Sequence, residues 1–357
     1  MFYLPDAAID VIKIFTLGTL SFVVAFWLTP FLTHFLYKHK LWRKEVRTKA
    51  IDGKDLTYFQ KFHAEGETHI PRFGGLLIWL VPSFLAGLFY LFYKADTGIW
   101  WLEKLSFLSR DQTWLPFFAL ITGATVGLLD DFLQVRGKGR YISGGLGLKQ
   151  RLVLMGMIGI VGAWWFYSKL ELSTLHVPGL GDFSIGLWYI PFFVIVMMAV
   201  YSGGVIDGLD GLAGGAFASI FGAYAGIALF LGQINLAAFC AAILGALLAF
   251  LWYNIPPARF FMTETGMMGL CAALTVVAFL TDSVLVLPII GVLLVMESGS
   301  VILQLLSKKF RGKKIFLAAP IHHHFEAKGW PAYKVTMRFW VIGAVAAIIG
   351  ITIRLLG

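Results

Sequence analysis

Paired acids at the end of an apolar run are the first residues in this sequence that could do chemistry. In the stretch LLDDF, the carboxylates of Asp130 and Asp131 follow a long apolar segment. Adjacent residues on a helix point about 100° apart, so both cannot face one ligand equally. One can act while the other orients it or binds a cation. The alternative is two solvated acids, but a helix C-terminus disfavours negative charge.

A second pair of acids stands among glycines in GGVIDGLDGLAGG. Asp207 and Asp210 are three residues apart and would share one face of a helix. The glycines permit a turn or a close approach of the backbone to a ligand. This pattern suits a nucleotide site or a phosphate–metal site. The alternative is an Asp-Gly turn that caps the next helix, which explains one aspartate better than two.

A single acid, Glu264, lies in WYNIPPARFFMTETG, just before the Thr-Gly pair of a plausible helix start. Carboxylate oxygens are hard ligands of the kind that Mg²⁺ prefers. Glu264 is therefore a candidate metal ligand. The alternative is a first-turn carboxylate that the helix dipole favours.

Three consecutive histidines, His322, His323 and His324, occur in AAPIHHHFEAKGWP. They cannot share one helical face, so they suit a loop or a short helix that lines a site. A zinc site is one interpretation, although the i, i+4 spacing and a nearby cysteine are absent from the stretch. A phosphate donor or proton carrier near neutral pH is another, and a polar surface loop is the third.

Together these residues combine acids, histidines and basic side chains. Carboxylates with a divalent cation can hold a pyrophosphate, Arg and Lys can neutralise its charge, and an aspartate can deprotonate or orient the attacking oxygen. The residue types therefore predict phosphoryl chemistry, without defining the substrate.

The elements that must position these residues are membrane helices. The chain has 357 residues and is 59% hydrophobic and 14% charged, whereas a soluble domain carries about 25% charge. A helix needs about 20 apolar residues to cross the hydrocarbon layer. Continuous apolar runs predict ten spans near 11–36, 74–93, 114–129, 149–167, 186–203, 211–231, 234–253, 266–281, 284–306 and 334–355. We therefore predict an all-α, polytopic membrane protein in which residues 1–357 form one domain. The glycine-rich stretch 200–213 is predicted to be a broken helix.

Basic residues predict the orientation of these spans. The loops near 37–73, 130–151, 254–265 and 307–338, together with the short joint near 204–210, carry 23 of the 29 Lys and Arg residues. Cytoplasmic loops are enriched in Lys and Arg, so these loops are predicted to be cytoplasmic, with both termini outside and all four candidate stretches inside. A net charge of +9 then forms a basic face suited to membrane lipid or an anionic substrate. Nucleic acid is disfavoured as a partner because no soluble module remains to bind it.

Two features argue against other classes of protein. The first span lacks a small-residue cleavage site, so we do not expect a removable signal peptide. Cys240 and Cys271 both lie inside apolar runs, where we expect buried packing residues instead of a disulfide framework or metal site.

The sequence resembles the bacterial phospho-N-acetylmuramoyl-pentapeptide transferases, within the polyprenyl-phosphate sugar-1-phosphate transferase superfamily. The resemblance runs from about Pro71 to the C-terminus. It rests on APIHHHFEAKGWPAYKVTMRFW, ESGSVILQLLSKKFRGKKIF, DGLDGLAGG, LLDDF and FLWYNIPPARFFM. The triple-histidine motif is the most specific of these. The resemblance implies ten membrane helices and a cytoplasmic active site in the bacterial inner membrane.

The implied reaction moves phospho-MurNAc-pentapeptide from UDP-MurNAc-pentapeptide onto undecaprenyl phosphate, with Mg²⁺, and gives lipid I and UMP. By motif position, the implied catalytic residues are Asp130, Asp131, Asp207, His322, His323 and His324. The implied metal ligand is Glu264. The implied substrate contacts are Asp210, Gly208, Leu209, Asn254, Phe261, Arg151 and Gln304, with Phe261 matching the residue that stacks on uracil. A homodimer is one assembly compatible with the resemblance.

Four departures from the family pattern fall within the motifs. Thr263-Glu264 stands where the family usually has Gly-Asp, which keeps the carboxylate but lengthens it by one methylene. The family's Asn-Leu-Thr-Asp is Gly-Val-Ile-Asp at 204–207. A family lysine is Arg151, which replaces a compact ammonium with a wide fork. The stretch HIPRFGG replaces the family's Gly-Thr-Pro-Thr-Met-Gly-Gly and is closer to GlcNAc-1-phosphate transferases.

The rival hypotheses follow from these departures. One keeps the chemistry with another UDP-sugar, such as UDP-GlcNAc, and another is a weakened homologue with a binding or scaffold role. A transporter would thread acids through the bilayer as a proton relay, whereas these acids cluster at one predicted face.

Overall fold

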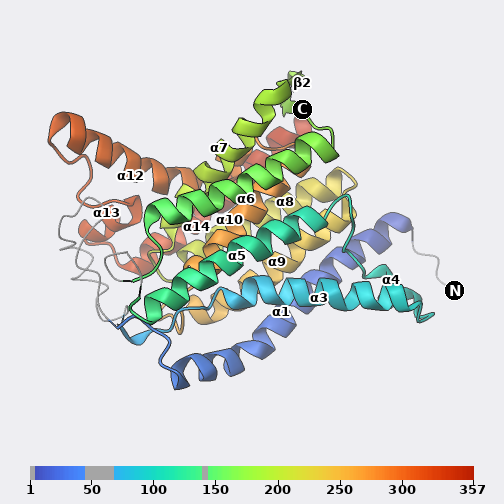
Figure 1. Ribbon diagram of the computed structural model, residues 1–357, viewed down its shortest axis with the longest axis horizontal. Helices are drawn as coiled ribbons and strands as arrows, with labels where there is room; N and C mark the ends of the chain where they lie inside the picture. Colours follow the sequence, from blue (N-terminus) through green and yellow to red (C-terminus); the bar gives the residue numbers. More distant parts are fainter. Residues whose placement is uncertain (1–4, 45–67, 139–143) are drawn as a thin grey trace.

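The computed structural model describes residues 5–44, 68–138 and 144–357 as a helical bundle with one short hairpin (Figure 1). Its elements are α1 (Asp6–Lys38), α3 (Leu76–Ala95), α4 (Trp100–Lys104), α5 (Trp114–Val135), α6 (Leu148–Lys169), β1 (Thr174–Val177), β2 (Gly181–Ser184), η1 (Gly186–Trp188), α7 (Tyr189–Ser202), η2 (Gly203–Ile206), α8 (Leu212–Phe230), α9 (Ile234–Asn254), α10 (Thr263–Leu280), α11 (Leu287–Ile290), α12 (Val292–Arg311), α13 (Ile321–Ala327) and α14 (Ala332–Leu356). β1 and β2 pair antiparallel, with Thr174 opposite Ser184.

Within the described residues, nine helices are long and apolar enough to cross a membrane. The apolar window of α10 is 89% buried and that of α9 is 78% buried, against 22% for α1 and α14. α9 and α10 therefore form the centre of the bundle. On the periphery, Phe15, Trp27 and Ile348 are each more than 60% exposed. Large apolar side chains in such numbers are stable outward only against lipid. The protein is an all-α, multi-pass membrane protein, as predicted.

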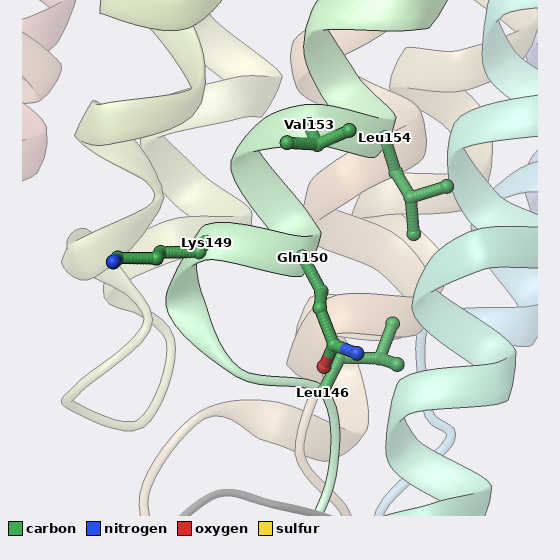
Figure 2. A pocket seen from close by; sticks show the side chains of 5 residues that line it. All are labelled: Leu146, Lys149, Gln150, Val153 and Leu154. Carbon is green, nitrogen blue, oxygen red and sulfur yellow. The ribbon is translucent and has the colours of Figure 1, made fainter.

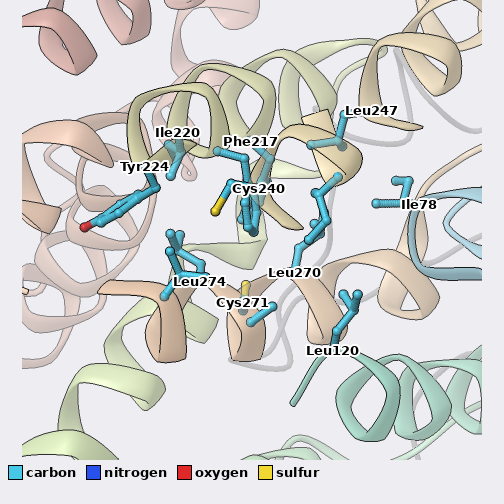
Figure 3. Packing of buried hydrophobic residues seen from close by; sticks show 14 of the residues in the cluster. Ile78, Leu120, Phe217, Ile220, Tyr224, Cys240, Leu247, Leu270, Cys271 and Leu274 are labelled. Atoms are coloured by element: carbon cyan, nitrogen blue, oxygen red, sulfur yellow. The ribbon is translucent and has the colours of Figure 1, made fainter. Parts of the chain in front are cut away.

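The two cysteines lie in the centre of this bundle. Figure 3 shows Cys240 and Cys271 among buried apolar side chains that include Phe217 and Leu270. Both thiols are free and fully buried. The prediction that they are packing residues is confirmed.

The predicted span at 284–306 is divided into two pieces, the short helix α11 and the longer helix α12, which projects from the bundle (Figure 1). α12 buries a polar face formed by Glu297, Ser300, Gln304 and Ser307. Its outward face is apolar, as at Leu303, which is 52% exposed. Apolar periodicity alone cannot distinguish such an inverted helix from a regular span, which is why the sequence predicted ten continuous spans.

Contacts place the two chain ends at one end of the bundle. Near the start of α1, the Lys13 Nζ donates to Asn235 Oδ1 over 2.7 Å, at the beginning of α9. Near the end of α14, the Arg354 Nε donates to Ser283 Oγ over 3.0 Å, just after α10.

Glycines bring α5 and α10 into close contact at that opposite end. A Cβ atom at Gly127 would lie 1.9 Å from the Glu264 carbonyl oxygen, and one at Gly123 would lie 2.6 Å from the Met268 carbonyl oxygen. Small residues allow membrane helices to approach backbone to backbone. Asp130 and Asp131 follow Gly127 by about one turn, so this seam sets them beside the first turn of α10.

Candidate active site

Asp131 is the most heavily bonded acid in the predicted site. It is fully buried. Its Oδ1 accepts from the Arg72 Nε and Nη2 over 3.1 and 2.9 Å. Its Oδ2 accepts from Thr263 Oγ1, Thr265 N and Thr265 Oγ1 over 2.5, 2.8 and 2.6 Å. A carboxylate offers about four lone-pair sites, so Asp131 is saturated and ties Arg72 to the start of α10.

Asp130 is also fully buried but faces a different neighbourhood, as the 100° helical offset predicted. Its carboxylate accepts from the Gln134 Nε2 over 2.7 Å and from the Leu146 backbone N–H. Its Oδ2 lies 3.7 Å from the Arg151 Nε. Gln134 in turn accepts from the Arg43 Nε over 3.0 Å. Asp130 is therefore held between α5 and the start of α6.

Glu264 lies in the first turn of α10. The guanidinium group of Arg151 links it to Asp130, because it lies close to both carboxylates. The Arg151 guanidinium donates to Glu264 Oε1, and the Tyr201 hydroxyl donates to Oε2 over 3.4 Å. The Glu264 side chain is 20% exposed, whereas that of Asp130 is fully buried. Glu264 is the more accessible of these two carboxylates.

Asp207 and Asp210 lie in the turn between η2 and α8, which is not helical. Asp207 Oδ2 accepts from the Thr263 N–H over 2.9 Å, and Asp210 Oδ2 accepts from the Ala258 N–H over 3.0 Å. Neither caps α8, whose N-cap, Gly211, makes no side-chain cap bond. Burial raises the pKa of Asp207 to about 6, against the lowering effects of the Thr263 N–H and Arg72. The two aspartates bind the segment 258–263, which ends at the first residue of α10, instead of capping α8.

The remaining residues of this turn meet two other motifs. Asn254, at the end of α9, accepts from the Gly211 N–H over 2.9 Å and donates to the Phe260 carbonyl over 2.8 Å. The neighbouring Phe261 is partly exposed. Leu209 lines, with Asp210, a cleft of about 450 Å³ whose other wall is formed by Glu326 and residues 329–332.

The first histidine of the motif reaches the glycine turn, within the short helix α13. His322 is fully buried, and its Nδ1 lies 2.8 Å from Glu297 Oε2 on α12. Its Nε2 faces Gly208, where a Cβ atom would lie 2.4 Å away. All three histidines lie in the short helix α13, one of the two conformations expected from the sequence, and the role of His322 in a site stays a prediction.

The other two histidines and Gln304 make hydrogen bonds within α13 and with the segment 315–317 before it. His323 Nδ1 lies 2.6 Å from Glu326 Oε2. His324 Nδ1 accepts from the Leu317 N–H over 3.1 Å, and partial burial lowers its pKa. Gln304 Oε1 accepts from the N–H groups of residues 315 and 316. No contact in the described residues brings these three side chains to the acids, so their predicted roles stay predictions.

A second hollow lies on the outer side of α6, next to the loop that binds Asp130. Figure 2 shows Leu146, Lys149, Gln150, Val153 and Leu154 around it, with Lys149 directed away from the apolar side chains. Its volume is about 360 Å³. It has apolar walls and a nearby ammonium group, but none of the predicted acids lines it.

Sequence reasoning missed several polar residues that contact the predicted ones, among them Arg72 and Glu297. Arg72 binds Asp131, and Glu297 binds His322. Glu297 had a usable signal, because it is the single acid inside the apolar run 284–306, and such acids are functional candidates. Arg72 follows a charged stretch that resembles a solvated loop, so its burial had no clear signal.

The charges of the site fit a divalent cation. In residues 5–44, 68–138 and 144–357, the linked network joins five carboxylates and two guanidinium groups: Asp130, Asp131, Asp207, Asp210, Glu264, Arg72 and Arg151. Carboxylate oxygens are hard ligands of the kind that Mg²⁺ prefers, and the Glu264 side chain, which is 20% exposed, is the one that a cation could reach from solvent.

Comparison with known proteins agrees with this arrangement. The sequence profile of glycosyl transferase family 4 matches residues 113–282, which include the acids and the seam between α5 and α10. A phospho-N-acetylmuramoyl-pentapeptide-transferase of Lactiplantibacillus plantarum is 37% identical over 338 residues, covering 93% of this chain and 95% of the relative. The enzyme of the same name from a Geobacillus species is 35% identical and covers 94% and 96%.

A more distant relative gives the same result. The phospho-N-acetylmuramoyl-pentapeptide-transferase of Chloroflexus aggregans is 33% identical, covering 97% of this chain and 91% of the relative. Similarity at this level over nearly the whole length, together with the convergence of the predicted motifs, means that the chain belongs to the phospho-N-acetylmuramoyl-pentapeptide-transferase family.

Proposed function

We propose that this protein transfers phospho-MurNAc-pentapeptide from UDP-MurNAc-pentapeptide to undecaprenyl phosphate and releases UMP. In this reaction an oxygen of the lipid phosphate attacks the phosphorus attached to the sugar. The bond from that phosphorus to the bridging oxygen breaks, and UMP leaves with the electron pair. The product is lipid I, in which the sugar phosphate and the lipid phosphate form a new pyrophosphate.

One observation carries the proposal: motifs far apart in the sequence share hydrogen-bond partners at one end of the bundle. Thr263 binds both Asp131 and Asp207, and Arg151 binds both Asp130 and Glu264. A pyrophosphate needs such a site, where cations neutralise its oxygens and carboxylates orient the nucleophile and bind a metal.

Each residue then has a proposed role. Asp130 orients the lipid phosphate or takes its proton, and Asp131 positions Arg72 and the first turn of α10. Asp207 and Asp210 organise the turn that binds the nucleotide. Asn254 fixes this turn, and Phe261 offers a partly exposed ring for the uracil.

Glu264 is the proposed Mg²⁺ ligand. Its side chain is reachable from solvent, and exchange of its Arg151 partner for a cation keeps the charge compensated. When bound, Mg²⁺ supplies charge neutralisation for the pyrophosphate oxygens. Arg151, once released from Glu264, remains within reach of Asp130 and can face an anionic substrate.

We also propose an orientation for the end of the bundle that carries Asp130, Asp131 and Glu264, which we call the acid end. It faces the cytoplasm of a bacterial inner membrane. The proposal rests on the 23-to-6 distribution of basic residues. Because both native cysteines are buried, single exposed cysteines can be introduced without background labelling. Lys314→Cys should react only from the cytoplasmic side and Leu180→Cys only from outside; the reverse pattern would invert the orientation.

The function is tested by offering the purified protein undecaprenyl phosphate with one donor at a time and following UMP release. UDP-MurNAc-pentapeptide should support turnover, and UDP-GlcNAc should not. Turnover with UDP-GlcNAc alone would instead assign the other sugar. Release of UMP from neither donor, by folded protein with Mg²⁺ present, would leave the binding or scaffold role.

A further inference from the structure

Tyr201 brings a hydroxyl group to Glu264 from α7, a helix that carries none of the predicted site residues. Tyr201 is 8% exposed, and its hydroxyl donates to Glu264 Oε2 over 3.4 Å. A buried tyrosine hydroxyl usually has a hydrogen-bond partner. Here that partner is the proposed metal ligand, so the hydroxyl is in a position to influence how the ligand is held.

The two carboxylate oxygens of Glu264 are held by different kinds of group. Oε1 accepts from the positively charged Arg151 guanidinium, and Oε2 accepts from the neutral Tyr201 hydroxyl. Arg151 has other partners, because its Nε donates to the Leu146 carbonyl over 3.1 Å and lies 3.7 Å from Asp130 Oδ2. A cation that arrives at Glu264 repels the guanidinium but not the neutral hydroxyl. The bond from Tyr201 can therefore remain when the cation takes the place of Arg151.

The packing around Tyr201 fixes where its hydroxyl lies. The carbonyl of the neighbouring Val200 accepts a hydrogen bond from Cys271 Sγ on α10 over 3.6 Å. This contact ties the last turn of α7 to α10, and burial leaves the ring of Tyr201 little freedom to turn away. A glutamate side chain, by contrast, is long and loses much rotamer freedom when it is fixed. A rigid donor from α7 therefore reduces the entropy that Glu264 loses when it binds a cation.

We propose that Tyr201 is a positioning residue for the metal: its hydroxyl holds Oε2 of Glu264, so that the carboxylate keeps one orientation when Mg²⁺ takes the place of Arg151. The inference rests on the proposed function and adds to it a residue outside the predicted motifs. Mg²⁺ demands near-ideal octahedral geometry, so a ligand held in one orientation binds it more tightly than one that turns freely. Loss of a hydrogen bond to a metal ligand typically weakens metal binding by about 10- to 100-fold.

The test measures the binding of Mn²⁺, a paramagnetic ion with the same preference for oxygen ligands, to the purified protein without substrates. Tyr201→Phe removes only the hydroxyl and should weaken Mn²⁺ binding about tenfold, measured by electron paramagnetic resonance. The matched control is Tyr189→Phe, at the other end of α7, where a buried tyrosine packs against Phe279. This control should bind Mn²⁺ within about twofold of the native protein. Unchanged or tighter binding by Tyr201→Phe would overturn the inference, as would an equal loss in the control.

Turnover separates positioning of the metal ligand from a purely structural role. In Tyr201→Phe, the Mg²⁺ concentration that gives half-maximal UMP release should rise about tenfold, while the rate at saturating Mg²⁺ stays within about twofold of the native rate. An unchanged half-maximal concentration with a lower saturating rate would mean that the hydroxyl supports the fold, and the inference would be wrong. Glu264→Gln should also lose Mn²⁺ affinity; if it binds Mn²⁺ as tightly as the native protein, Glu264 is not a ligand and the inference fails with it.

The same measurements distinguish this inference from the proposed reaction. If the native protein makes lipid I and Tyr201→Phe binds Mn²⁺ normally, the inference is wrong while the function stands. If the native protein makes no lipid I but Tyr201→Phe loses Mn²⁺ affinity and Tyr189→Phe does not, the positioning role stands and the proposed reaction is wrong.

Discussion

The two ends of the bundle each carry a polar cluster, and they differ in how the cluster is built. At the end that holds both termini, ligand atoms of His176, Asp182 and Asp282 lie within 4.8 Å of one another. The Asp182 side chain there is 65% exposed. At the other end Asp130 and Asp131 are fully buried and are bound by residues from distant parts of the chain.

The comparison teaches that proximity of ligand atoms is a weaker sign of function than desolvation. Asp182 is largely solvated, and His176 and Asp282 are only partly buried, so these three side chains can gather at a lower cost than fully buried ones. Buried acids must be compensated, and at the acid end the compensation comes from Arg72, Arg151 and three backbone N–H groups, those of Leu146, Thr263 and Thr265. We therefore expect the function of the protein to lie at the end of the bundle that carries Asp130 and Asp131.

The largest expected difference between the ends follows from removing one carboxylate charge from each. Glu264→Gln should abolish Mg²⁺-dependent turnover, because an amide is a poor ligand for a hard cation. Asp282→Asn at the opposite end should leave turnover unchanged. UMP release measured against Mg²⁺ concentration checks both. Unchanged activity and Mg²⁺ dependence in the Glu264 variant would refute its assignment as metal ligand.

Asp130→Asn should lower turnover by about 10²- to 10⁴-fold, the usual range for a general base, with binding of the UDP-sugar nearly unchanged. The second pKa of a phosphate monoester is about 6, so the lipid phosphate is mostly dianionic at neutral pH. Higher pH should therefore rescue the variant if deprotonation is the lost step, and should not if positioning is lost. A full rate at pH 7 would move the role to Asp131 or to a nucleophile that arrives deprotonated.

Gly127→Ala should destabilise the protein by about 1–3 kcal/mol or more, because overpacking forces apart a tight contact. The new methyl group would meet the Glu264 carbonyl oxygen at the seam of α5 and α10. Gly156→Ala on α6 is the matched control, since nothing lies within 4 Å of its Cβ position, and alanine favours helix by about 1 kcal/mol. The midpoint of thermal unfolding, measured in detergent, should fall for Gly127→Ala only. Equal midpoints for the two variants would mean that α5 and α10 are not tightly packed at Gly127.

Part of the fold and of the candidate site could be predicted from the sequence alone. It predicted the acids and the first histidine of the site, since acids beside apolar runs are rare enough to signal function. It also predicted the break between α7 and α8, because glycines cluster there. It did not predict that Asp131 is saturated or that α12 turns its polar face inward, because both depend on contacts between distant segments. Thr263 illustrates this, since its hydroxyl donates to Asp131 and its backbone N–H donates to Asp207.

The smallest expected effect is a pH dependence of stability that comes from Asp207. Its pKa is raised by burial from the ordinary value of 3.8 to about 6 in the folded protein. Between these two values the folded state binds the proton more tightly than the unfolded state, so the contribution of Asp207 to stability is greatest below pH 3.8 and is lost as the pH rises to about 6. Asp207→Asn should remove this part of the decline in the unfolding midpoint.

Mg²⁺ should separate this contribution from that of the opposite end, where burial also raises the pKa of Asp282. A nearby cation favours the ionised carboxylate and so lowers the folded pKa of an acid. Added Mg²⁺ should flatten the pH dependence of the native protein and of Asp282→Asn, but have little effect on that of Asp207→Asn. Midpoints measured from pH 4 to 7, with Mg²⁺ or with a chelator, provide the comparison. If Mg²⁺ flattens the decline equally with and without Asp207, the cation binds elsewhere and the acid end is held together by its arginines alone.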